Sequence, residues 1–67
     1  MKLNELMKVV PNEQKVTIYD DNGTMYADTE KIGEVRWEAV APVVDAKVNF
    51  INTSYAENTI AVEVHQS

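Results

Sequence analysis

The first apolar residues of the chain are spaced as on one face of a short α-helix. A spacing of i, i+3, i+4 and i+7 marks a single helical stripe, and it is occupied here by Leu3, Leu6, Met7 and Val10. Pro11 ends the segment, because proline cannot continue helical hydrogen bonding. A helix this short is not stable alone in water, so we expect its apolar face to pack against other elements.

Two pairs of alternating segments follow, and each pair predicts a β-hairpin. In the first pair, Val16 and Ile18 alternate with polar residues before the turn sequence DDNG, and TMYAD is the returning strand. In the second pair, AKVNFIN and NTIAVEVH lie on either side of the polar link SYAEN. Each hairpin has one apolar face for the helix, and we expect both Val48 and Phe50 on that face.

The segment between the hairpins, TEKIGEVRWEAVAPVVD, fits two patterns. Trp37 and Val44 belong to a helical spacing that Pro42 interrupts, while the alternation that starts at Val35 also suits a strand. We favour a short helix over residues 35–41 followed by an extended PVV.

These elements predict an α+β fold: a short N-terminal helix packed on an antiparallel sheet of two β-hairpins, with a short central helix or loop. Residues 1–67 contain no linker, repeat or low-complexity tract, so we interpret them as a single small α+β domain. A chain of 67 residues is near the lower limit for a core without staples. The absence of cysteine excludes disulfides and thiolate metal sites.

The chain start MKLNELMKVV is not typical of a signal peptide, because Asn4, Glu5 and Lys8 interrupt its short apolar run. No stretch approaches the roughly 20 apolar residues of a membrane helix. We therefore expect a cytoplasmic protein with no membrane contact.

Charge is distributed unevenly along the chain. The net charge is −5, and the whole excess lies between Asp20 and Asp45, where there are seven acids and two bases. An acidic middle disfavours direct binding to nucleic acid, because phosphate contacts need Lys and Arg. It favours a protein partner with a basic surface through complementary potential. The alternative is a solvated acidic surface that keeps a small protein soluble.

The stretch IYDDNGTMY resembles a binding site more than any other part of the chain. An EF-hand calcium loop with Gly23 at its sixth position would place Ile18 first and Thr29 twelfth, where carboxylates are required. The metal interpretation is therefore disfavoured, and we predict no metal site. A tight turn explains the stretch instead, because Asp and Asn suit bends and Gly23 provides a positive φ.

Two turn geometries suit this stretch. One is a two-residue loop at Asn22-Gly23, and the other is a three-residue loop with a glycine bulge. The choice decides whether Tyr19 faces Tyr26 or Met25.

No constellation typical of an enzyme is present in the sequence. His65 is the only histidine, and it has no cysteine or second imidazole with which to share a metal. Gly23 and Gly33 are the only glycines, so there is no glycine-rich phosphate loop. We predict a non-enzymatic protein with no catalytic residue and no cofactor.

The chain has too many aromatic side chains for all of them to be buried in so small a core. Tyr and Trp are frequent in interface hot spots. We expect Tyr19 and Tyr26 to be exposed, whereas Trp37 is slightly favoured as a core anchor. A free strand edge beside the tyrosines could also pair with a second copy, as in a homodimer. The candidate interaction surface consists of Tyr19, Asp20, Asp21, Tyr26, Glu34, Trp37 and Glu38.

The order of these features resembles small proteins of phages and prophages in Gram-positive bacteria. The resemblance rests on a short helix in LNELMKVV, then VTIYDDNGTMY, a GEVRW segment and a closing valine-rich hairpin. It implies an accessory protein that acts in the cytoplasm of an infected host cell by binding a host or phage protein.

Two functions are then in competition. One is an acidic inhibitor of a basic nucleic-acid-handling host protein, as in anti-defence proteins of the anti-CRISPR kind. The other is a structural or assembly module that works as a homo-oligomer or as a fixed subunit of a phage complex.

Overall fold

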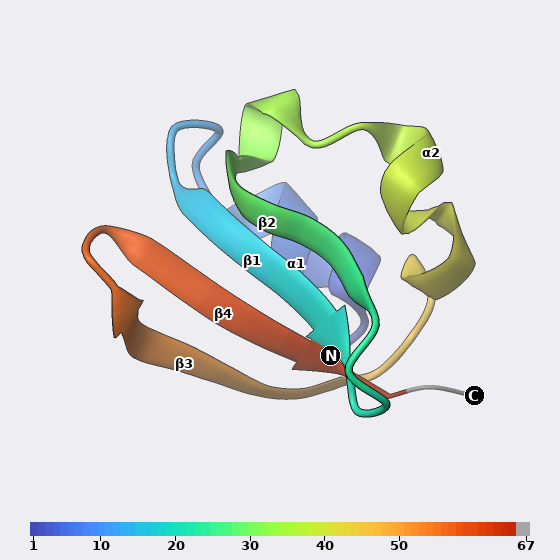
Figure 1. Cartoon of the computed structure of the whole chain (residues 1–67). Coiled ribbons are helices and arrows are strands. Elements are labelled where there is room, and N and C mark those ends of the chain that lie inside the picture. The colour runs from blue at the N-terminus through green and yellow to red at the C-terminus, as the bar shows by residue number, and fades with distance from the viewer. Residues whose placement is uncertain (66–67) are drawn as a thin grey trace.

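A four-stranded sheet in the order β2-β1-β4-β3 forms the centre of the fold (Figure 1). The computed structural model describes residues 1–65 of the chain. Its strands are β1 (Lys15–Asp20), β2 (Met25–Lys31), β3 (Val48–Ala56) and β4 (Thr59–Val64). Its helices are α1 (Leu3–Val9) and α2 (Trp37–Val40), with two short 3-10 helices, η1 (Ile32–Glu34) and η2 (Ala41–Val43).

The predicted α+β class and both hairpins are confirmed, but the sheet is mixed rather than antiparallel throughout. β1 pairs antiparallel with β2, and β3 pairs antiparallel with β4, whereas the central strands β1 and β4 run parallel. A parallel neighbour requires a crossover, which the segment from η1 to η2 provides between the two hairpins. The alternation of residues within a strand does not determine whether the adjacent strands of two hairpins run parallel or antiparallel. The expectation of an antiparallel sheet was therefore wrong for β1 and β4.

Helix α1 begins and ends where the sequence predicts. At its start, the backbone N–H of Lys2 donates to Glu5 Oε1 at 2.7 Å, which is one half of a capping box. At its end, Val10 leaves the helical conformation before Pro11. Leu3 and Leu6 are buried, and the N–H of Leu3 donates to the carbonyl oxygen of Ala46 at 2.9 Å. The short helix is therefore fixed by both packing and backbone hydrogen bonds.

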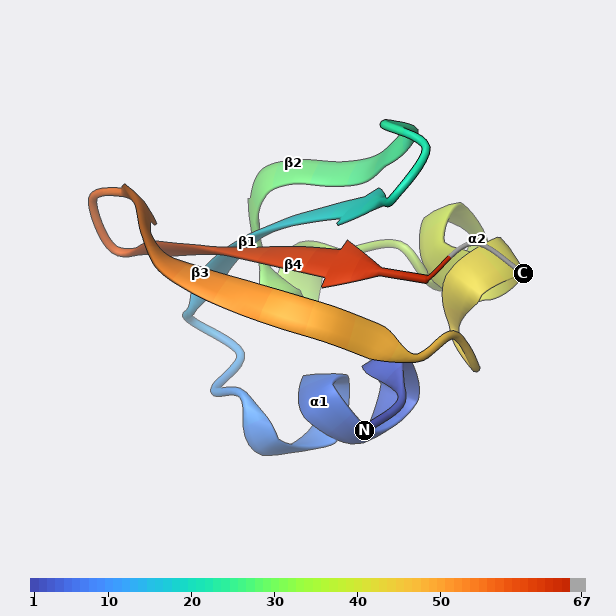
Figure 2. The ribbon, with the colours of Figure 1, turned by 90° about the horizontal axis from the view of Figure 1, so that it is seen from below.

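The core lies on one face of the sheet. Helix α1 lies behind the sheet in Figure 1 and below it in Figure 2, and no helix within residues 1–65 covers the opposite face. The buried apolar cluster consists of Leu3, Leu6, Val16, Ile18, Ala27, Ile32, Val40, Val43, Val62 and Val64. A chain of this length supplies enough helix for one face only. On the opposite face, side chains at the middle of the sheet are still buried, namely Thr17, Thr59 and Ala61.

The central segment is helical further along than the sequence predicts. The expected short helix is present as α2, but the expected extended PVV is wrong, because Ala41–Val43 continues as the 3-10 helix η2. Pro42 stands in the first turn of η2, where its missing N–H is tolerated. The result is that Val40 and Val43 both point into the core.

A β-bulge at Asn49 reverses the expected orientation of Phe50. Val48 lies opposite Val64 and Phe50 lies opposite Glu63, so one extra residue is accommodated in β3. The side chain of Phe50 is therefore 50% exposed instead of packing beside Val48 on the core face. The regular alternation of residues contains no sign of this bulge, and the prediction for Phe50 was wrong.

Val40→Ala is expected to lower the free energy of unfolding by roughly 2 kcal/mol, because it removes fully buried methyl groups. The matched control is Val9→Ala, since each valine is the last residue of a short helix, and Val9 is 72% exposed while Val40 is 0% exposed. The control should change stability by less than about 0.5 kcal/mol. Urea unfolding measures both variants, and equal losses would contradict the docking of α2 on the core.

Candidate functional site

The stretch IYDDNGTMY forms a three-residue loop between β1 and β2. The N–H of Asp20 donates to the carbonyl oxygen of Thr24 at 3.0 Å, so Asp21, Asn22 and Gly23 make the turn. Gly23 has a φ of +88°, which is the conformation that favours glycine. Of the two predicted geometries, this is the loop with a glycine at the bulge position, and it places Tyr19 opposite Met25.

The carboxylate of Asp20 holds this loop together. Its Oδ1 accepts the backbone N–H groups of Asn22 and Thr24, both at 2.9 Å, and its Oδ2 accepts the hydroxyl of Tyr26 at 2.8 Å. The side chain is 1% exposed. A buried charge is stable only when hydrogen bonds replace its water, and three donors do so here. Asp20 is therefore a structural anchor of the loop.

The same hydrogen bonds shift two pKa values in opposite directions. Burial alone would raise the pKa of Asp20, but the hydrogen bonds from Thr24, Tyr26 and Asn22 outweigh it, so the pKa lies below its ordinary value. The hydrogen bond to Asp20 raises the pKa of Tyr26, and burial adds to that effect. At neutral pH the pair is a hydroxyl donor and an ionised acceptor.

A second polar network lies beside this loop and joins its tip to β3 and β4. Asp21 Oδ2 lies 3.1 Å from His65 Nδ1 and accepts a hydrogen bond from Asn49 Nδ2 at 3.3 Å. Asn49 Nδ2 also donates to Glu63 Oε2 at 3.1 Å. The bulge residue Asn49 thus links the two hairpins through two carboxylates. His65 is exposed and directly follows the last strand.

One row of side chains crosses the face of the sheet that no helix covers. The strand register places Met25, Tyr19, Glu63 and Phe50 next to one another on four successive strands. Their neighbours in β1 and β4 belong to the core, so the row points away from α1. Burial raises the pKa of Tyr19, and the nearby groups of Glu63 and Tyr55 add to this shift. We call these four residues the open-face row.

Exposed acidic residues and a tryptophan lie on the edge strand β2 and on the helical segment that follows it. β2 is an edge strand, and it leads directly into η1 and then α2 (Figure 1). Trp37 is 60% exposed, so the prediction that it anchors the core was wrong. We define the acidic side as the exposed residues Asp28, Glu30, Glu34, Trp37 and Glu38.

The seven candidate residues do not form one surface. Asp20 and Tyr26 meet on the core-facing side of the first hairpin, whereas Tyr19 belongs to the open-face row. Asp21 lies at the loop tip, and the remaining three lie on the acidic side. Both tyrosines are half-buried, so the expectation that they are exposed held only in part. Three of the seven, Glu34, Trp37 and Glu38, are exposed and lie close together in the sequence.

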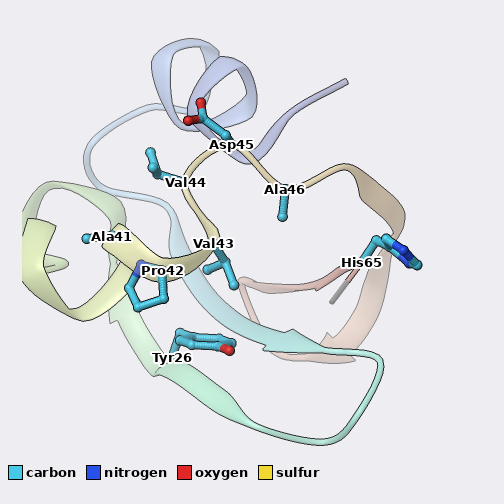
Figure 3. Close-up of a pocket in the computed structure, with 8 residues that line it drawn as sticks. All are labelled: Tyr26, Ala41, Pro42, Val43, Val44, Asp45, Ala46 and His65. Atoms are coloured by element: carbon cyan, nitrogen blue, oxygen red, sulfur yellow. The ribbon is translucent and has the colours of Figure 1, made fainter. Parts of the chain in front are cut away.

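A cleft of about 380 Å³ opens between the first hairpin and the segment after α2. Figure 3 shows Tyr26, Pro42 and Val43 facing one another across it, while the carboxylate of Asp45 points toward α1. That carboxylate accepts a hydrogen bond from Asn4 Nδ2 at 3.1 Å. The Tyr26 hydroxyl is engaged by Asp20, and the cleft walls combine apolar side chains with polar surface. Within the cleft, the Tyr26 hydroxyl and the Asp45 carboxylate already have hydrogen-bond partners in the chain.

Two kinds of site are not found among residues 1–65. No group of three His, Cys, Asp or Glu side chains is placed so that it could hold a metal ion. No helix in this range is long and apolar enough to cross a membrane.

Three exposed apolar residues were missed as surface candidates: Met25, Phe50 and Tyr55. The loop length decides the position of Met25, and the bulge decides that of Phe50. The one available signal was the uncharged composition of residues 48–56, which is unusual for an edge strand.

Comparison with protein-family models, curated proteins and solved structures gives no match to this chain. Its function is therefore inferred from its residues and their geometry.

Asp20→Asn is expected to make the free energy of unfolding depend less steeply on pH in the acidic range. Because the pKa of Asp20 is lowered by folding, its ionised form stabilises the folded state above the ordinary value of 3.8, and this contribution is lost as pH falls through the lower folded pKa. Unfolding followed between about pH 5 and 2 should show a steep loss for the wild type and a shallower one for the variant. Asp28→Asn, at an exposed position of β2, should keep the steep loss; if it flattens the curve equally, Asp20 is not its source.

Proposed function

We propose that this chain is a non-enzymatic binding protein whose acidic side contacts a basic surface of another protein. The observation that carries the proposal is the exposed tryptophan among exposed carboxylates. Trp37 is 60% exposed, with Glu38 next to it in α2 and Glu34 in the preceding η1. A large aromatic side chain that is exposed to water contributes little to the core, so it is available for contact with a partner.

The tryptophan would supply most of the contact area. Trp side chains bury a large area at a low cost in conformational entropy, and they are frequent in interface hot spots. The ring can also receive a guanidinium or ammonium group over its face. Arg36 Nε lies 3.8 Å from Glu38 Oε2, and both side chains are about four-fifths exposed. An ion pair this exposed is weak, so a basic side chain of a partner can replace Arg36.

The carboxylates would supply steering and selectivity. Four of them lie on β2, η1 and α2, within the part of the sequence that holds the entire charge excess. Complementary potential raises association rates, and like charge suppresses binding to acidic surfaces. Exposed charges are screened beyond about 8 Å at physiological salt, so binding of this kind weakens as salt is raised.

The biological setting we propose is that of a phage or prophage accessory protein. The resemblance in sequence order supports it, and the acidic side suits a target that normally holds nucleic acid on a basic surface. An inhibitor of a nucleic-acid-handling host protein, as in anti-defence proteins of the anti-CRISPR kind, combines both features.

The test is capture of host proteins on the immobilised chain with Glu34→Gln/Glu38→Gln. This variant should lose a basic partner that the wild type retains at low salt and releases at raised salt. The matched control is Glu13→Gln/Glu57→Gln, which makes the same change of net charge, from −5 to −3, outside the acidic side. If the control loses the partner equally, overall charge rather than the acidic side is responsible.

Trp37→Ala separates the aromatic contact from the charges. It should weaken binding of the same partner by at least about tenfold, the range of a hot-spot residue, without changing the net charge. Isothermal titration with the purified partner measures this loss. Unchanged affinity would show that Trp37 lies outside the interface.

A further inference from the structure

The tip of the loop between β1 and β2 contains an asparagine that is followed directly by glycine. Asn22 and Gly23 are both exposed, and the loop projects beyond the end of the sheet (Figure 1). No atom outside residues 22–24 lies within 4 Å of the position that a Cβ on Gly23 would occupy. The backbone nitrogen of Gly23 is therefore shielded neither by a side chain of its own nor by another element of the fold.

We propose that Asn22 is a site of spontaneous deamidation and that the hydrogen bonds to Asp20 set the rate. The Gly23 nitrogen attacks Cγ of Asn22, so that an N–Cγ bond forms while the Cγ–Nδ2 bond breaks. The side-chain nitrogen leaves as ammonia and takes the proton of the Gly23 N–H. Water then opens the resulting five-membered imide at either of its two C–N bonds, which gives aspartate or isoaspartate. This proposal does not depend on the function proposed for the acidic side.

The folded loop opposes this reaction. The N–H of Gly23 donates to the carbonyl oxygen of Asp20 at 3.0 Å, so it is directed at Asp20 and not at the side chain of Asn22. The N–H groups of Asn22 and Thr24, on either side of this bond, are both held by Asp20 Oδ1 at 2.9 Å. The hydrogen bond of Gly23 must break before its nitrogen can attack, and the other two resist that opening. Local opening of the loop therefore limits the rate.

The other exposed asparagines provide a comparison within the same chain. Each of them is followed by a residue with a side chain, and they are Asn12, Asn49, Asn52 and Asn58. The most informative is Asn58, because it also lies in a hairpin turn, between β3 and β4, and has a φ of +56°. The next residue is Thr59, whose β-branched side chain crowds its own backbone nitrogen. Deamidation at Asn22 should therefore precede deamidation at the other four.

Each product changes the loop in its own way. Aspartate at position 22 changes the net charge from −5 to −6 and adds a carboxylate directly after Asp20 and Asp21. Isoaspartate adds one carbon to the backbone between residues 22 and 23. The N–H groups of residues 22 and 24, which share Asp20 Oδ1, then no longer have the spacing that fits one oxygen. Deamidation is thus an irreversible change of this loop that accumulates with the age of the chain.

The test is incubation of the whole chain at mildly alkaline pH, followed by digestion with trypsin and mass spectrometry. Cleavage after lysine releases residues 16–31, in which Asn22 is the only asparagine, and residues 48–67, which contain three others as an internal reference. Chromatography separates the aspartate and isoaspartate products, and a digest at zero time corrects for conversion during handling. Conversion should occur first in residues 16–31. It should be at least about tenfold slower in the folded chain than in a synthetic peptide of residues 16–31.

Tyr26→Phe tests the control by Asp20. It removes the hydroxyl that donates to Asp20 Oδ2 at 2.8 Å, and it should speed conversion of the folded chain by at least about threefold. The matched control is Tyr19→Phe, because Tyr19 is also half-buried but belongs to the open-face row. This control should keep the rate of the wild type.

Several outcomes would overturn the proposal. One is conversion in residues 48–67 before residues 16–31, and another is a folded chain that reacts as fast as the peptide. Equal rates in the two tyrosine variants would show that Asp20 does not control the reaction. Asn22→Ala should abolish conversion in residues 16–31, and conversion that persists there would exclude Asn22 as its source.

Discussion

The parallel pairing of β1 with β4 is the contact on which the rest of the fold depends. At their middle both strands are buried on both faces, with Ile18 and Val62 in the core and Thr17 and Ala61 almost fully covered on the opposite side. These two strands supply four residues of the buried apolar cluster, Val16, Ile18, Val62 and Val64, whereas the outer strands supply only Ala27 to it. The outer strands are therefore the more exposed ones. The open-face row and the acidic side both lie where this small core leaves side chains uncovered.

The loop of the first hairpin is held by one carboxylate, while the strands of that hairpin supply Val16, Ile18 and Ala27 to the core. Asp20 binds two backbone N–H groups of its own loop and the hydroxyl of Tyr26 on β2. Asp21 continues this connection to Asn49 and His65 at the ends of the second hairpin. Hydrogen-bonded carboxylates thus join the two hairpins at this end of the sheet.

Much of the fold could be predicted because it is encoded locally. The stripe from Leu3 to Val10, the stop at Pro11 and the turn at Gly23 each depend on the chemistry of a few neighbouring residues. The parallel centre and the bulge at Asn49 depend on how distant segments meet, and no periodicity contains that information. The predictions for the site residues were less accurate for the same reason, because tertiary packing decides whether Trp37 and Phe50 are exposed.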